Sequence, residues 1–167
     1  GSAVTAGNGS SLADLEFFDV RSMQWGVVAA HDTAPVSRYY HGMATVAGRV
    51  YVYGGYRDTG DERTGILGDL FCFDPTTGNW TEMLPNGTTS PPARKAAGVT
   101  AVGNDILVFG GYGQAGYLND AWRFHVPTRA WTRMHYAPSA SSSSAAGARF
   151  SGSASGPSRD ASAPAIL

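Results

Sequence analysis

Short apolar runs that end at paired glycines are the most regular feature of the chain. The segments GRVYVYGGY (48–56) and NDILVFGGY (104–112) each carry branched and aromatic residues into a Gly-Gly pair. Runs of this composition, closed by glycine, are typical of β-strands. No window of the sequence shows the periodicity of an amphipathic helix. The pattern therefore predicts an all-β protein.

A second pattern is anchored on tryptophan and occurs three times. The segments DLEFFDVRSMQW (14–25), DLFCFDPTTGNW (69–80) and DAWRFHVPTRAW (120–131) each begin with aspartate and place phenylalanine four positions later. The copies are offset by 55 and 51 residues, a period typical of propeller repeats that each supply one four-stranded blade. The sequence predicts that the aromatic residues of this pattern hold the fold together: Phe18, Phe73, Phe124, Trp25, Trp80 and Trp131.

The glycine pairs have two possible roles. A phosphate-binding loop would need Gly-x-Gly-x-x-Gly, or a Walker-type loop, leading into a helix whose N-terminus holds the anion. Here a polar, turn-like segment follows Gly55 and another strand comes after it. The sequence therefore favours a structural role, in which the pairs let crowded strands bend. The residues concerned are Gly54, Gly55, Gly110 and Gly111.

The combined signature resembles that of the kelch-repeat family over about residues 12–136. The matching features are the apolar runs into Gly-Gly, the aromatic residue of the second pattern and its tryptophan. The family usually has tyrosine where this chain has Phe73 and Phe124. The resemblance implies kelch-type β-propeller blades, each a four-stranded antiparallel sheet. Two and a half blades cannot close a ring of four to eight, so we expect an incomplete propeller or a fragment of a larger one.

The repeats divide the chain into parts. The last part is rich in Ser, Ala and Gly, which is typical of disorder, and it can also be the start of a further repeat. In that case Arg149 occupies the position in its repeat that is equivalent to Arg38 and Arg94. We expect a flexible N-terminal segment at 1–11, a half blade and linker at 12–34, a blade at 35–84, a second blade at 91–136 and a low-complexity segment at 137–167.

Composition excludes several classes of partner. The formal net charge is −1 and charged residues make up 15% of the chain, so no long-range field draws in nucleic acid or an acidic membrane surface. No apolar run approaches the roughly 20 residues of a membrane-spanning helix. The single cysteine, Cys72, excludes a disulfide within the chain. Together with an N-terminus unlike a signal peptide, it favours a cytoplasmic location.

The sequence predicts no enzyme site. The four histidines lack the His-x-His and His-Glu-x-x-His spacings of metal sites, and no Gly-x-Ser-x-Gly motif is present. The repeated aspartates recur once per blade, as residues of the fold should. We therefore expect no catalytic residue, no metal and no cofactor.

Arginines are the candidate partner-binding residues. Arg38, Arg94 and Arg149 lead equivalent segments, and the resemblance implies loops near the channel mouth, where arginines of several family members hold acidic peptides. A guanidinium group recognises carboxylates well. The alternative is that each arginine braces a neighbouring blade by bonding loop carbonyls. Arg57 and Arg63, in the loop 56–68, are further candidates, with a purely solvated loop as the alternative.

These observations predict a non-enzymatic scaffold that recognises another protein, in particular an acidic peptide segment, through the loops between its strands. A purely structural propeller segment is one alternative. The resemblance also leaves open an enzyme, since the family includes oxidases, mutarotases and specifier proteins. Open blade faces and unpaired strand edges favour association. We therefore expect contacts with the remaining blades of a longer parent chain, or self-association.

Overall fold

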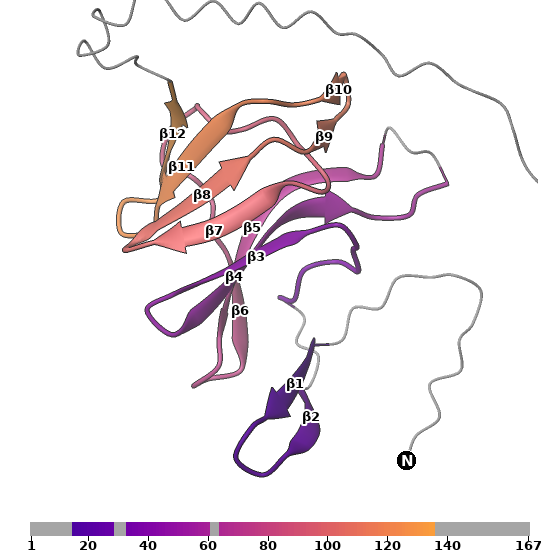
Figure 1. Cartoon of the computed structure of the whole chain (residues 1–167), viewed down its shortest axis with the longest axis vertical. Helices are drawn as coiled ribbons and strands as arrows, with labels where there is room; N and C mark the ends of the chain where they lie inside the picture. Colours follow the sequence, from indigo (N-terminus) through magenta and orange to yellow (C-terminus); the bar gives the residue numbers. More distant parts are fainter. Residues whose placement is uncertain (1–14, 29–32, 61–63, 136–167) are drawn as a thin grey trace, which may run out of the picture. The chain divides into compact units, whose positions relative to one another are not determined.

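The computed structural model describes residues 15–28, 33–60 and 64–135, and every regular element in these ranges is a β-strand (Figure 1). The prediction of an all-β fold is confirmed. The predictions on Arg63, on Arg149, and on the segments 1–11 and 137–167 fall on residues outside the described ranges.

Two four-stranded antiparallel sheets form the described core. The first sheet has the order β3-β4-β5-β6 and the second has the order β7-β8-β11-β12, so neighbours follow one another along the chain except that the small β9–β10 hairpin lies between β8 and β11. This is the meander expected of a propeller blade. The first sheet contains β3 (Gly42–Val46), β4 (Arg49–Tyr56), β5 (Ile66–Asp74) and β6 (Asn79–Glu82); the second contains β7 (Gly98–Val102), β8 (Asp105–Phe109), β11 (Ala121–His125) and β12 (Ala130–Met134).

Two smaller hairpins complete the described strands. β1 (Leu15–Asp19) pairs with β2 (Gln24–Val28), and β9 (Tyr112–Gly113) pairs with β10 (Gly116–Tyr117). The first of these, the N-terminal hairpin, carries the first copy of the tryptophan pattern. The second occupies the loop that follows the glycine pair of the second sheet.

The main hydrophobic core lies between the two sheets. Side chains of a strand alternate between its faces, so Tyr53 and Leu70 point toward the second sheet while Val52 and Phe73 point away from it. The opposite face of the first sheet packs against Leu15 and Val28 of the N-terminal hairpin. The buried core between the sheets consists of Val46, Tyr51, Tyr53, Leu70, Cys72, Met83, Ile106, Val108, Trp122, Phe124 and Trp131.

The phenylalanine and tryptophan of each repeat face each other across neighbouring strands. The pairs are Phe18 with Trp25, Phe73 with Trp80, and Phe124 with Trp131. Their ring centroids lie 5.2, 5.0 and 4.9 Å apart, a separation at which tilted aromatic rings attract each other. The repeated pattern is thus a repeated cross-strand contact.

The first glycine pair, Gly54–Gly55, lies against the segment that leads into the second sheet. Gly54 has a φ of 60°, and a Cβ atom at this position would lie 2.6 Å from the Arg94 carbonyl oxygen. The next residue, Gly55, donates its backbone N–H to that same oxygen at 2.9 Å. A side chain at Gly54 would therefore both strain the backbone and push the sheets apart.

Candidate recognition site

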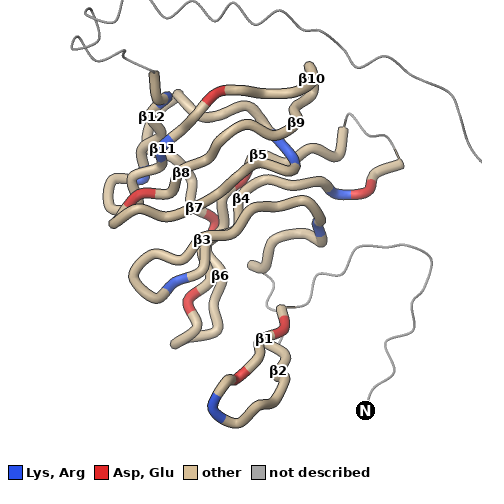
Figure 2. Tube along the Cα trace, in the orientation of Figure 1, with Lys and Arg blue, Asp and Glu red and all other residues tan. Residues whose placement is uncertain are grey.

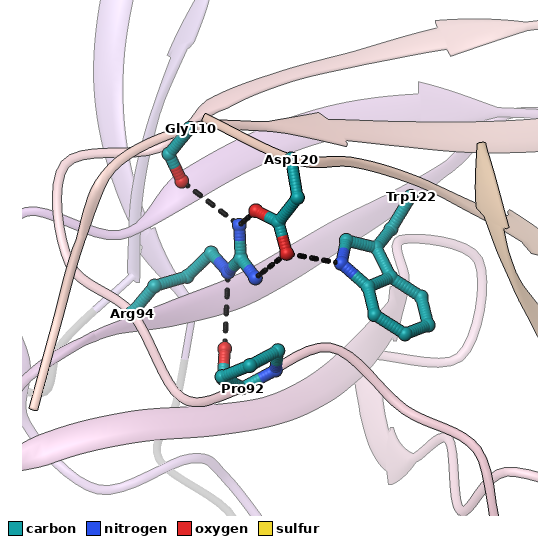
Figure 3. A network of polar contacts seen from close by, with 5 residues as sticks. All are labelled: Pro92, Arg94, Gly110, Asp120 and Trp122. Atoms are coloured by element: carbon teal, nitrogen blue, oxygen red, sulfur yellow. Dashed lines mark hydrogen bonds and ion pairs between the residues drawn. The ribbon is translucent and has the colours of Figure 1, made fainter. Parts of the chain in front are cut away.

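Arg94 lies just before β7 and is buried, with 1% of its surface exposed. Its side chain stands at the centre of a network of polar contacts (Figure 3). Its Nε donates to the Pro92 carbonyl at 3.0 Å and its Nη1 to the Gly110 carbonyl at 2.9 Å. The two Nη atoms donate to the two carboxylate oxygens of Asp120 at 2.7 and 3.1 Å. The Trp122 indole donates to the same carboxylate at 2.7 Å. Arg94 thus ties its own loop to the glycine pair and to the start of β11.

These contacts hold Asp120 in its charged form. The hydrogen bond from Arg94 is the main cause that lowers the pKa of Asp120 from 3.8 to about 2, and the bond from Trp122 acts in the same direction. Partial burial opposes the shift and is outweighed. The ion pair is therefore intact throughout the physiological pH range.

Arg38 makes the same set of contacts in the first sheet. Its Nε donates to the Val36 carbonyl at 3.1 Å and its Nη1 to the Gly54 carbonyl at 3.0 Å. Its two Nη atoms donate to Asp69 at 2.5 and 2.9 Å. The repeat in sequence is therefore a repeat in geometry, with one arginine–aspartate brace for each four-stranded sheet.

This geometry bears on the predicted partner-binding arginines. The guanidinium groups of Arg38 and Arg94 are buried and bonded to carbonyls and a carboxylate of their own chain. Such contacts resemble the bracing alternative, except that each arginine side chain braces its own blade and not a neighbouring one. The sequence pattern places the arginines and the aspartates in the same repeat, but their pairing was not predicted from it. The pairing could have been found, because both residue types recur together in each of the two blades.

The backbone of Arg94 also joins the two sheets. Its N–H donates to the Leu67 carbonyl at 2.9 Å, and its carbonyl accepts the N–H of Gly55 at 2.9 Å. Nearby, the N–H of Ala96 donates to the Tyr40 carbonyl at 2.8 Å. Arg94 therefore links the first sheet through its backbone and the second through its side chain.

Tyrosines from both repeats surround the next residue, Lys95; Tyr56 is buried and the others are partly or fully exposed. The Lys95 ammonium lies 4.7 Å from the ring centroid of Tyr56 and 5.5 Å from that of Tyr112, a cation–π arrangement with one ring from each repeat. Rings of the group also contact one another at centroid distances of 5.0 to 5.2 Å. We call this group the tyrosine–lysine cluster: Tyr39, Tyr40, Tyr56, Lys95, Tyr112 and Tyr117.

The cluster borders an open hollow of about 260 Å³, which is lined by Tyr40, Lys95, Ala96, Tyr112 and Tyr117. Tyr117 is 93% exposed and Tyr40 61% exposed. The backbone at Tyr40 and Ala96 is left-handed, with φ of 57° and 54°. Both are unusual conformations for residues other than glycine. The hydrogen bond from the Ala96 N–H to the Tyr40 carbonyl joins these two residues across the repeats.

The sequence pattern did not predict this cluster, because most of its positions do not repeat: Tyr40 corresponds to Ala96 and Tyr39 to Lys95. The available signal was the number of tyrosines close to the two glycine pairs. Arg57 directly follows β4 and is exposed. Its role in partner binding stays a prediction.

Neither metal-binding clusters nor long apolar helices are found in residues 15–28, 33–60 and 64–135. No three side chains of His, Cys, Asp or Glu gather there in a way that could hold a metal ion. In the same ranges no helix is long and apolar enough to cross a membrane. Basic and acidic residues are scattered along the traced strands (Figure 2).

Comparison with known proteins identifies the repeat. The model of the KLHDC2/KLHL20/DRC7 Kelch-repeats domain matches residues 3–154 of this chain. The chain belongs to the kelch-repeat family. The resemblance read from the sequence is thereby confirmed, as is the assignment of the four-stranded sheets to kelch blades. Proteins of this family generally mediate protein–protein interactions.

Curated relatives are similar over about 70% of this kelch chain. Kelch domain-containing protein 3 of Bos taurus is 30% identical over 129 residues, which cover 71% of this chain and 32% of the relative. Tip elongation aberrant protein 3 of Schizosaccharomyces pombe is 31% identical over 144 residues, which cover 72% of this chain and 13% of the relative. The match thus spans a third or less of these relatives.

Proposed function

We propose that this kelch-repeat chain is a recognition module that binds an acidic segment of another protein through its tyrosine–lysine cluster. The observation that carries the proposal is the position of Lys95. Its ammonium group lies over the rings of Tyr56 and Tyr112, beside an open hollow between the loops of two blades. A charge held in place in this way loses little conformational freedom when it binds a partner.

The chemistry of the cluster suits a protein partner. Tyrosine is enriched at the energetic centres of protein interfaces, because it offers a large rigid contact area and a polar tip. Lys95 forms no ion pair with any carboxylate among the described residues. Its charge is therefore available to a carboxylate of the partner, whereas the charges of Arg38 and Arg94 are already matched by Asp69 and Asp120.

Selection of peptides from a random displayed library on the immobilised chain tests this proposal. We expect the selected peptides to be enriched in Asp and Glu. Substitution of Lys95→Ala or Tyr112→Ala should weaken their binding by at least about tenfold, the loss expected for a central interface residue. Arg133→Ala removes an exposed charge on β12, outside the cluster, and should leave the affinity unchanged.

Two results would overturn the proposal. One is the absence of any acidic preference among the selected peptides. The other is binding that survives both cluster substitutions. Selection of no peptide at all by the folded chain would favour a purely structural role for these blades.

A further inference from the structure

A second, polar cavity of about 420 Å³ lies between the two sheets. It is found at the other end of β4 from the tyrosine–lysine cluster, since β4 begins at Arg49 and ends at Tyr56. Strands of the first sheet form one wall, and the β11–β12 turn of the second sheet forms the other. Among the polar residues that line the cavity are Arg49, Tyr51, Asp74, Asn79, Thr81 and Arg129.

The carboxylate in this cavity is already engaged. The Nε and Nη2 atoms of Arg49 donate to Asp74 Oδ2 at 3.0 and 2.9 Å, and the backbone N–H of Thr76 donates to Asp74 Oδ1 at 2.9 Å. The hydrogen bond from Arg49 is the main cause that lowers the pKa of Asp74, so the carboxylate stays charged. Arg49 and Asp74 therefore neutralise each other.

Arg129 supplies the charge that remains. Among the described residues no carboxylate lies within ion-pair distance of Arg129. Two arginines and one aspartate line the cavity, which leaves one positive charge. The side-chain amide of Asn79 and the hydroxyl of Thr81 add further donors. The cavity thus offers hydrogen-bond donors and one net positive charge.

The chain holds Arg129 in a defined position at some conformational cost. Its φ is 53°, in the left-handed region that favours glycine, and the equivalent turn of the first sheet has Gly78 with a φ of 72°. Asn86, in the linker between the sheets, fixes the turn. Its N–H donates to the Arg129 carbonyl at 2.8 Å, and its side-chain amide donates to the Thr128 carbonyl at 3.0 Å. The turn that brings Arg129 to the cavity is thereby fixed.

We propose that this cavity is an anion site that takes a single carboxylate group, with Arg129 as its main recognition residue. A carboxylate carries the one negative charge that the cavity lacks, and its planar oxygens match the fork of a guanidinium group. A cavity of about 420 Å³ is large enough for the side chain that carries the group. The carboxylate can come from a protein side chain or from a small metabolite.

Titration of the isotope-labelled 167-residue chain, followed by NMR, tests this site. The probes are sodium acetate, the blocked peptide acetyl-Gly-Glu-Gly-amide and inorganic phosphate, each at constant ionic strength. We expect saturable shifts of the Asn79 side-chain amide and of the Arg129 Nε–H signal with both carboxylates. Tighter binding of the peptide than of acetate would indicate a protein source, and equal binding a small-molecule source.

Arg129→Gly is the decisive variant, because glycine relieves the left-handed backbone and occupies this place in the first sheet. It should keep the fold and lose at least about tenfold in carboxylate affinity. Arg133→Gln removes a charge elsewhere on β12 and should change the affinity by less than about twofold. The proposal fails if neither carboxylate gives saturable shifts, if Arg129→Gly binds as well as the unchanged chain, or if phosphate binds more tightly than both carboxylates.

Discussion

The two sheets carry the same repeat, yet equivalent residues in them differ sharply in exposure. Tyr53 in β4 and Phe109 in β8 precede the two glycine pairs, and Tyr53 is 1% exposed whereas Phe109 is 62% exposed. Val46 and Val102, at the ends of β3 and β7, differ in the same way. In each sheet the alternation of the strand points these side chains to the same face. Only the first sheet has a described neighbour on that face.

This difference distinguishes structural features that are fixed within one blade from the burial of side chains, which depends on the neighbouring blade. Strand register, the aromatic pair and the arginine–aspartate brace are internal to a blade, so they are the same in both sheets. Burial depends on the next blade. The N-terminal hairpin shows this most clearly, because Trp25 is 73% exposed while its counterparts Trp80 and Trp131 are each 8% exposed.

Removal of an arginine brace should give the largest effect and sharpen the comparison between the sheets. Arg94→Ala leaves Asp120 without its charged partner and two carbonyls without a donor, so we expect a loss of about 4 kcal/mol in the free energy of unfolding. Arg38→Ala should cost less, because the Asp69 side chain is 24% exposed and that of Asp120 only 11%. Urea unfolding measures both losses, and equal losses would contradict the account.

Truncation of the tryptophans should give the next largest effect. Trp131→Ala empties a site in the core between the sheets and should cost about 3 kcal/mol. Trp25→Ala should cost less than about 1 kcal/mol, because most of that side chain is already in contact with solvent. Thermal unfolding of the two variants makes the comparison. A similar loss at both positions would mean that the aromatic pair, and not the neighbouring sheet, provides the stabilisation.

A side chain added at the glycine pair should have a smaller effect. Gly54→Ala strains a backbone with positive φ and brings a Cβ atom against the Arg94 carbonyl, so we expect a loss of about 2 kcal/mol. Gly48→Ala is the matched control, since its φ of 77° is also positive but no atom lies within 4 Å of the added Cβ. Its loss should be about half as large. Indistinguishable losses in urea unfolding would exclude the close approach of the sheets as the reason for glycine.

Acid should weaken the brace of the second sheet. The pKa of Asp120 is about 2 in the folded chain and 3.8 is its ordinary value, so the contribution of its charge is complete above the ordinary value. It is lost as the pH falls through the folded value. We therefore expect the free energy of unfolding to decrease more steeply in this acid range for the unchanged chain than for Asp120→Asn. Parallel pH profiles would show that Asp120 gains nothing from Arg94.

Most of the fold could be predicted from the sequence, because its signals are local. The apolar runs into Gly-Gly and the spacing of Phe73 from Trp80 specify strands and a turn, and repetition multiplies each signal. The pairing of Arg94 with Asp120 was harder to find, since β7, β8 and the small β9–β10 hairpin lie between the two residues along the chain. The tyrosine–lysine cluster was missed because its exposed surface is assembled from loops of two blades, and no single repeat contains it.

A double-mutant cycle on Arg94 and Asp120 tests most directly the claim that a paired charge, repeated in each blade, holds the segments of that blade together. The measurement is the free energy of unfolding in urea for the unchanged chain, Arg94→Ala, Asp120→Ala and the double variant. We predict a coupling energy of about 2 kcal/mol, because each single substitution leaves a buried charge unpaired and the double substitution leaves none. Strictly additive losses would contradict the account and return Arg94 to the candidates for partner binding.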